Sequence, residues 1–389
     1  MVTQLHVVTN ADDHIFGDAL AGDVAIRSYL EPLKKYLGVA GVTELCINRP
    51  GEIIIEVQGD KRVISEPSLT YGALEAFANA IAVYAQQSIG PTKPLLSATL
   101  PDGERVQIVL PPAVEPGIIN FTIRVPGTAV IPIESYTQSG AFSSYLWARP
   151  EDLEQKLQVL EGEDRALAFH LAVGRLDFFI TEAIKAKKNI AVVGDTGSGK
   201  TTLMKSMCQS IPFQERLITI EDVRELWLPS HIDKAHLLYS KNNQGAASIT
   251  PSDLISSCMR MYPSRVLLAE LRGGEAWDFL KLLSAGHSGS ITSFHAESCS
   301  LAFERFMFMS KENEQASSLS RAELLNLVNM TLDVVIHVKR EVVPSENGKG
   351  VAVRRYVDEV HFDPWAKMAA RFAGKETAVK AAHFAEVSA

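Results

Sequence analysis

The sequence contains little cysteine, and no two of its cysteines are closely spaced. Only four of the 389 residues are cysteine, and none of them forms a CxxC pair. A disulfide framework and a thiolate zinc site both need clustered cysteines, so neither is expected here. This cysteine usage favours a reducing compartment.

Long apolar runs and an excess of basic charge are also missing. No uncharged stretch reaches the roughly 18 residues that a transmembrane helix needs, and the polar, acidic N-terminus does not match a signal peptide. The 38 Lys and Arg residues are outnumbered by 46 Asp and Glu, which gives a net charge of -8. We therefore expect a cytoplasmic protein without direct sequence-specific nucleic-acid binding.

The chain is long enough for two domains, and 46% of its residues are hydrophobic. Within residues 1–125, helical spacing such as Leu74, Phe77 and Ile81 alternates with short strand-like runs joined by tight turns. This predicts an N-terminal α+β domain with a mainly antiparallel sheet. Gly, Pro and Ser are frequent afterwards, so we expect an interdomain linker over residues 126–164.

The remainder, residues 165–389, has α/β character. Helical stretches alternate with expected strands at residues 189–193, 217–220, 266–269 and 290–293. This order predicts a mostly parallel sheet covered on both faces. Towards the end, residues 332–339 and 351–362 surround a polar turn at 345–348, which predicts a late hairpin followed by a basic tail helix.

A glycine-rich loop between the first expected strand and the next helix carries the strongest chemical signal. Its sequence matches GxxxxGK[ST], and with one following threonine it supplies the expected nucleotide-binding residues Gly194, Asp195, Thr196, Gly197, Ser198, Gly199, Lys200, Thr201 and Thr202. Backbone N–H groups of such a loop surround phosphate oxygens, the lysine reaches the β- and γ-phosphates, and Thr201 can ligate Mg²⁺. We therefore expect ATP and Mg²⁺ as cofactors.

Two of the expected strands end in carboxylates, at Glu221 and at Glu270. Ligands of open α/β sheets bind at the carboxyl ends of the strands. Such acids are often only helix caps or solvated groups. Next to a phosphate loop, however, one is needed to hold Mg²⁺ and another to orient the attacking water.

His287 and His295 lie on either side of a short β-branched strand. A zinc site is not expected, because no cysteine or third histidine lies at ligand spacing. Each imidazole can either satisfy core hydrogen bonds or contact the γ-phosphate.

Four segments, in order, resemble the four boxes of the secretion traffic ATPases: GDTGSGKTT, TIEDVREL, RVLLAELRGGEAWDFLKLLSAGH and GSITSFHA. The chain most resembles the hexameric type IV secretion ATPases, with pilus-motor and type II secretion ATPases as relatives. The resemblance implies a C-terminal RecA-like P-loop ATPase domain in a cytoplasmic homohexameric ring. It further implies that ATP hydrolysis powers type IV secretion or conjugative transfer and pilus biogenesis, with inner-membrane channel and other ATPase components as partners and peripheral membrane association.

The resemblance also implies roles for the three residues at the strand ends. Glu221 would orient the attacking water, Glu270 would be the Walker B acid that holds Mg²⁺ through water, and His295 would sense the γ-phosphate. Thr201 and Glu270 would therefore form the protein side of the metal site.

Four arginines match basic positions of the family. Arg105 and Arg124 match positions from which the N-terminal domain reaches the nucleotide, and Arg260 and Arg265 precede the Walker B strand. The alternative for each is an ordinary solvated surface charge. The family tends to have a second Arg and an Asp where this chain has Tyr262 and Ser264. The resemblance is weakest over residues 340–389, which form either a system-specific element or a solvated tail.

Three other functions remain open on the sequence alone. A pilus or type II secretion motor would share the active site and differ in partners. A nucleotide-regulated scaffold would not need Glu221, Glu270 and His295 together. A DNA translocase is disfavoured by the acidic balance and by the lack of a recognisable DNA-binding motif.

Overall fold

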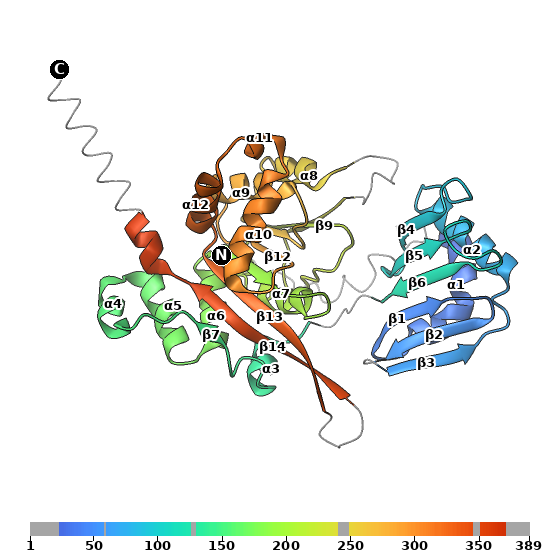
Figure 1. The fold of residues 1–389 in the computed structure, drawn as a ribbon, viewed down its shortest axis with the longest axis horizontal. Coiled ribbons are helices and arrows are strands. Elements are labelled where there is room, and N and C mark those ends of the chain that lie inside the picture. Colours follow the sequence, from blue (N-terminus) through green and yellow to red (C-terminus); the bar gives the residue numbers. More distant parts are fainter. Residues whose placement is uncertain (1–22, 58–59, 126–129, 240–248, 345–350, 371–389) are drawn as a thin grey trace, which may run out of the picture. The chain divides into compact units, whose positions relative to one another are not determined.

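The computed structural model describes residues 23–57, 60–125, 130–239, 249–344 and 351–370 (Figure 1). The chain forms two compact units. The first comprises the residues up to 128 and takes in Asp222–Glu225 from later in the chain, and the second comprises most of the rest. The division follows the predicted change from α+β to α/β sequence.

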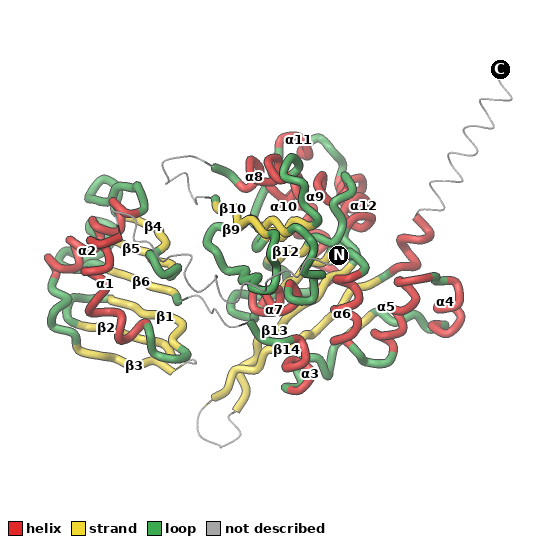
Figure 2. The backbone as a smooth tube through the Cα atoms, turned by 180° about the vertical axis from the view of Figure 1, so that it is seen from behind, coloured by secondary structure: helices red, strands yellow, loops and turns green. Residues whose placement is uncertain are grey.

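The first unit is an antiparallel sheet with two helices on one face (Figures 1 and 2). The helices are α1 (Asp23–Leu37) and α2 (Tyr71–Tyr84). The strands lie in the order β3 (Asp60–Ser65), β2 (Glu52–Val57), β1 (Val42–Ile47), β6 (Asn120–Arg124), β5 (Arg105–Val109) and β4 (Leu95–Thr99). The predicted α+β fold of this part is confirmed.

Alternation of side chains explains why one face of this sheet is covered. In β2, Ile53 and Ile55 are buried while the intervening residues are partly exposed. The helical spacing of α2 directs Phe77 onto the sheet, where its ring stacks on Phe121 with 5.3 Å between the centroids. Burying each such side chain contributes about 1.5–3 kcal/mol. Strand β3 was not predicted, because it is a largely exposed edge strand without an apolar alternation.

The second unit is built on an eight-stranded sheet. Its strands lie in the order β10 (Lys234–Leu238), β9 (Leu217–Glu221), β11 (Arg265–Leu268), β12 (Ile291–Phe294), β8 (Ile190–Val193), β13 (Val334–Pro344), β14 (Val351–Phe362) and β7 (Leu146–Trp147). The strands from β9 to β13 pair in parallel, whereas β14 runs antiparallel to β13. The predicted mostly parallel sheet is confirmed.

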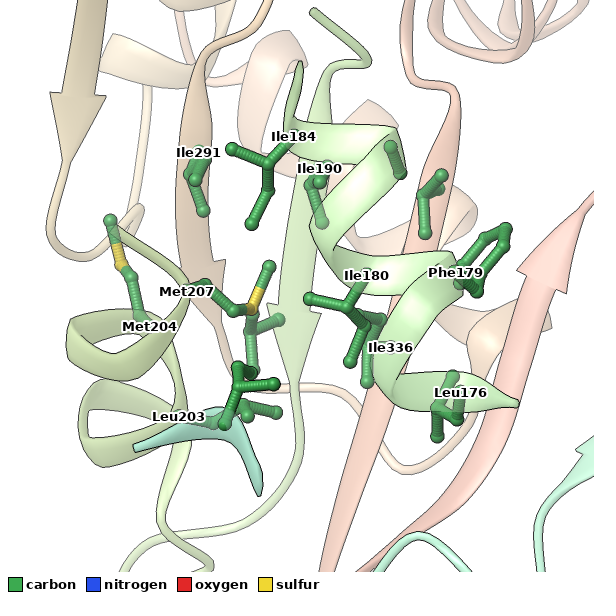
Figure 3. Packing of buried hydrophobic residues seen from close by; sticks show 14 of the residues in the cluster. Leu176, Phe179, Ile180, Ile184, Ile190, Leu203, Met204, Met207, Ile291 and Ile336 are labelled. Atoms are coloured by element: carbon green, nitrogen blue, oxygen red, sulfur yellow. The ribbon is translucent and has the colours of Figure 1, made fainter. Parts of the chain in front are cut away.

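Helices cover both faces of this sheet. On one face α6 (Leu176–Lys185) and α7 (Lys200–Cys208) pack over β8, β12 and β13, and Figure 3 shows Ile180, Met207 and Ile291 in the resulting core. On the other face Phe306 of α10 (Cys299–Lys311) packs edge-on against Phe294, with 5.8 Å between ring centroids. Strands buried on both faces are continuously apolar, and β8 is an example. Four further helices of this part are α8 (Pro251–Cys258), α9 (Glu275–Ser284), α11 (Glu314–Ser317) and α12 (Arg321–Thr331).

The expected linker over 126–164 differs from the structure. Residues 126–129 lie outside the described part, but the rest contains α3 (Ile133–Gln138), β7, α4 (Leu153–Val159) and the start of α5 (Gly162–Ala172). The Gly, Pro and Ser residues of this segment keep its helices and strand short. Apolar side chains between them nevertheless anchor the segment to the core of the second unit. These side chains include Ile133, Phe142 and Leu160.

The C-terminal residues are also not a simple tail. Strands β13 and β14, here called the C-terminal hairpin, pair over their whole length and complete the second sheet. Val357, Val360 and Phe362 are buried in its core. The predicted hairpin is confirmed, whereas the predicted turn at 345–348 and most of the expected tail helix lie outside the described residues. Across the described ranges, no helix combines the length and apolarity needed to cross a bilayer.

Candidate active site

The glycine-rich segment 194–199, called the phosphate loop below, connects β8 to α7 at the carboxyl edge of the second sheet. Gly194 leaves the strand against the hairpin, where a Cβ atom would lie 2.1 Å from the carbonyl oxygen of Val338. Only glycine fits there. Gly199 has a φ of 101° and caps α7, so the loop turns sharply into the helix N-terminus. This geometry directs N–H groups and the helix dipole towards one point, as an anion site requires.

Lys200 is held inside the loop. Its side-chain amine donates to the carbonyl oxygens of Gly194 and Asp195 at 2.8 and 2.9 Å, and the residue is only 8% exposed. Burial lowers the pKa of Lys200, and the charges of Glu270 and Asp195 oppose this shift. The two carbonyl groups hold the amine beside the loop that would surround the phosphates.

Glu270 and His295 meet Lys200 at the same edge of the sheet. His295 Nδ1 lies 3.3 Å from Lys200 Nζ, and His295 Nε2 lies 3.3 Å from Glu270 Oε1. The second carboxylate oxygen of Glu270 accepts a 2.6 Å hydrogen bond from Arg272. The structure thus brings the predicted phosphate-binding lysine, Walker B acid and sensor histidine together. Arg272 was not predicted, although it follows Glu270 by two residues.

Glu221 is fully buried at the end of β9. One of its oxygens accepts a 2.8 Å hydrogen bond from Thr219 Oγ1, and the other accepts the backbone N–H of Leu226 at 2.9 Å. His236 Nδ1 lies 2.8 Å from the same threonine hydroxyl and 3.5 Å from the carboxylate. The Thr219 hydroxyl and the Leu226 N–H fix the orientation of the carboxylate. The strand-end position agrees with the prediction, whereas Thr219 and His236 were not singled out from the sequence.

The two N-terminal arginines lie on neighbouring strands of the first unit, where Arg105 and Arg124 are paired by register. Arg105 forms ion pairs with Asp222 at 2.9 Å and with Glu225 at 2.8 Å, residues that belong to the same compact unit. Arg124 is exposed at the end of β6. Arg105 is therefore fixed by Asp222 and Glu225, whereas Arg124 presents its charge to solvent.

Arg265 is not a surface residue, so the alternative of an ordinary solvated surface charge is wrong for it. It is fully buried, forms a bidentate ion pair with Glu215 at 2.8 and 2.9 Å, and donates to the carbonyl oxygen of Ile184 at 2.7 Å. It begins β11 and so lies at the opposite end of the sheet from Glu270. Arg260 is exposed after α8. His287 precedes β12 and lies one strand length away from His295.

Oxygen ligands for Mg²⁺ are available from Thr201, in the first turn of α7, and from Glu270. A separate group, His337, Asp358 and Glu359, has ligand atoms within 4.8 Å of one another. Glu359 already accepts the backbone N–H of Cys299 at 2.8 Å, and Lys339 lies 3.6 Å from Asp358. We interpret this group as structural polar contacts of the hairpin.

Comparison with known proteins shows which family this chain resembles. The family model for "Type II/IV secretion system protein" matches residues 175–384. The type IV secretion system protein VirB11 of Brucella suis is 41% identical over 367 residues, covering 93% of this chain and 98% of that protein. PtlH of Bordetella pertussis is 39% identical over 335 residues, covering 86% and 94%. The solved structure of the Legionella pneumophila ATPase DotB shares 16% identity with a TM-score of 0.51, covers 90% of this chain and 85% of that one, and is similar in fold.

Proposed function

The chain belongs to the type II/IV secretion system protein family and is a secretion ATPase, and we propose that it acts as a Mg²⁺-dependent homohexameric ring serving a type IV secretion or conjugation apparatus. The observation that carries the proposal is the meeting of Lys200, Glu270 and His295 at one edge of a RecA-like sheet. The similarity to VirB11 over nearly the whole chain supports the choice of apparatus.

Each of these residues has a defined part in the proposed reaction. The phosphate loop and Lys200 hold the β- and γ-phosphates, and Thr201 and Glu270 would hold Mg²⁺, which supplies charge neutralisation on the phosphate oxygens. Glu221 orients a water for in-line attack on the γ-phosphate. His295 links the γ-phosphate position to Glu270. The barrier falls through positioning and charge stabilisation, with no covalent intermediate.

The ring and its location are proposals that rest on relatives. Ring ATPases commonly complete one subunit's site with an arginine from outside the core fold, and Arg124 is exposed and suited to this task. Peripheral association with the inner membrane would use channel proteins and other ATPase components of the apparatus. Identification of proteins recovered with the chain from detergent-solubilised membranes tests this part directly.

The enzymatic part is tested with purified Lys200→Ala and wild-type protein. We expect the variant to lose ATP hydrolysis, because no other ammonium in the described part of the loop replaces the lost charge. Thermal melting should stay close to wild type, which separates loss of chemistry from loss of fold. Hydrolysis at the wild-type rate would contradict the assignment of the phosphate loop.

A further inference from the structure

The C-terminal hairpin extends beyond the helices that cover the second sheet. In β13, the first five residues are buried and the rest, from Lys339 onward, are mostly exposed. Ile336 and Val338 face the same core as α7, so alternation places Arg340 on that side of the sheet too. Arg355 is its cross-strand partner on β14. Two guanidinium groups therefore lie side by side on the face from which α7 starts.

Both arginines lie against the phosphate loop. Arg355 Nε donates a 3.0 Å hydrogen bond to the carbonyl oxygen of Gly197. A Cβ atom added to Gly199 would lie 3.3 Å from Cδ of Arg355, and one added to Gly197 would lie 3.9 Å from Cδ of Arg340. A Cβ at Gly199 would lie tightly against Arg355, whereas one at Gly197 would be at ordinary contact distance from Arg340. Gly199 thus serves both the loop conformation and the close approach of Arg355.

The positive charges of Arg340 and Arg355 beside the phosphate loop are not neutralised by neighbouring carboxylates within the described residues. Burial, together with the neighbouring charge of Arg340, lowers the pKa of Arg355. Within the ranges that the structure describes, neither guanidinium forms an ion pair with a carboxylate. Inside the loop, the hydroxyl of Ser198 is buried and has no hydrogen-bond partner among the described residues. Two adjacent cations and an unused hydroxyl at the loop are favourable surroundings for a polyanion.

The strand order decides which part of a nucleotide these arginines would meet. Glu270 and His295 follow β11 and β12, on one side of β8, whereas the hairpin lies on the other side. The γ-phosphate must point towards Glu270 and His295 if they are to act on it. The phosphates nearer the nucleoside then lie on the hairpin side.

We propose that Arg340 and Arg355 of the C-terminal hairpin bind the α- and β-phosphates of the nucleotide, opposite the catalytic acid and histidine. The inference rests on ATP binding at the phosphate loop. These contacts exist in both ATP and ADP, because both nucleotides carry these two phosphates. The arginine pair therefore sets nucleotide affinity and retention of the product, and it leaves the chemical step to Lys200, Glu221 and Glu270.

The test compares binding of ADP and of the non-hydrolysable ATP analogue AMP-PNP to the full-length chain by calorimetry. Arg355→Ala and Arg340→Ala should each weaken both nucleotides to the same extent, by about 10-fold, as expected for loss of one hydrogen bond to a charged group. KM for ATP should rise similarly, while kcat stays within about threefold. Arg354→Ala is the matched control, because this residue precedes Arg355, stacks on Tyr356 and points to the opposite face of the hairpin.

The outcomes separate the inference from the proposed function. Weaker AMP-PNP binding with unchanged ADP binding would place the arginines at the γ-phosphate and overturn the inference. Unchanged binding of both nucleotides, with tight wild-type binding, would also overturn it and leave the ATPase assignment intact. Wild-type protein that binds neither nucleotide would refute the phosphate loop itself. If an alanine variant has a lower melting temperature than wild type, Arg355→Lys serves as the second variant. Lysine keeps the positive charge but lacks the planar guanidinium, so we expect an ADP affinity between those of wild type and Arg355→Ala.

Discussion

His295 Nε2 lies 3.3 Å from Glu270 Oε1, although the two residues follow different strands of the second sheet. The other ring nitrogen faces the amine of Lys200 at 3.3 Å. A lysine ammonium can only donate, so the geometry assigns Nδ1 as the acceptor and Nε2–H as the donor to the carboxylate. His295 therefore bridges the phosphate-binding lysine and the acid.

Replacing this bridge should impair turnover more than binding. We expect His295→Ala to lower kcat by about 10²-fold, the lower end of the range for positioned proton-transfer groups. ADP affinity should change little, because the phosphate loop remains intact. Steady-state kinetics and ADP titration check this. His287→Ala, at the other end of β12, is the control and should retain wild-type kcat. Equal kinetics of the two variants would remove the catalytic role of His295.

Glu221→Gln should uncouple binding from hydrolysis. The amide keeps the shape of the side chain and can still accept the N–H of Leu226, which now meets a carboxylate oxygen at 2.9 Å. It cannot accept the proton of an attacking water, so we expect turnover to fall by about 10²- to 10⁴-fold. Single-turnover hydrolysis and nucleotide binding on the same preparation measure both effects. Lost binding with normal turnover of bound ATP would instead make Glu221 a binding residue.

Arg124→Ala tests two proposals together: that Arg124 contributes to ATP hydrolysis, and that the active form is a ring. Wild-type specific activity should rise with protein concentration until rings form, because a neighbouring subunit completes each site. The variant should form rings as the wild type does but show lower ATPase activity at every concentration. Loss of an arginine finger can lower kcat by about 10³-fold. ATPase rate and light scattering are measured in parallel. Arg62→Ala, exposed on edge strand β3, is the control. A fully active monomer would contradict the ring.

Arg265→Met should destabilise the second unit. Removing one partner of a buried ion pair costs about 3–5 kcal/mol, since Glu215 and the carbonyl of Ile184 lose their donor. Burial raises the pKa of Glu215, but the hydrogen bonds and charge of Arg265 outweigh this and keep it below the usual value.

The sign of the pH dependence follows from that depressed pKa. The ion pair's contribution is present above the unfolded-state pKa of Glu215 and is lost as pH falls through the folded-state value. Denaturant melts at pH 7 and at stepwise lower pH should therefore show the wild type converging towards Arg265→Met in acid. Lys185→Ala, which breaks an exposed pair with Glu182, should cost less than about 1 kcal/mol. A constant difference between wild type and Arg265→Met across the pH range would contradict this account.

The sequence was most informative where function depends on a local conformation. The phosphate loop could be predicted because its glycines, Lys200 and the flanking strand and helix are contiguous. Arg265 could not be placed correctly, because only the folded sheet brings Glu215, fifty residues away in sequence, beside it. The hydrogen bond from Arg355 to Gly197 spans 158 residues and has no local signal. Strand β7 has two residues, too short for any periodicity.

The pairing of β7 with β14 also affects how shortened chains must be interpreted. Leu146 and Trp147 lie beside Glu359 and Val360, and the indole N–H of Trp147 donates to the carbonyl of Phe362 at 3.1 Å. A chain ending before β14 would leave two strands with open backbone edges, and such edges promote aggregation between molecules. Poor solubility of a C-terminal truncation would then reflect an incomplete sheet, so the role of the hairpin must be tested by point substitutions that leave both strands in place.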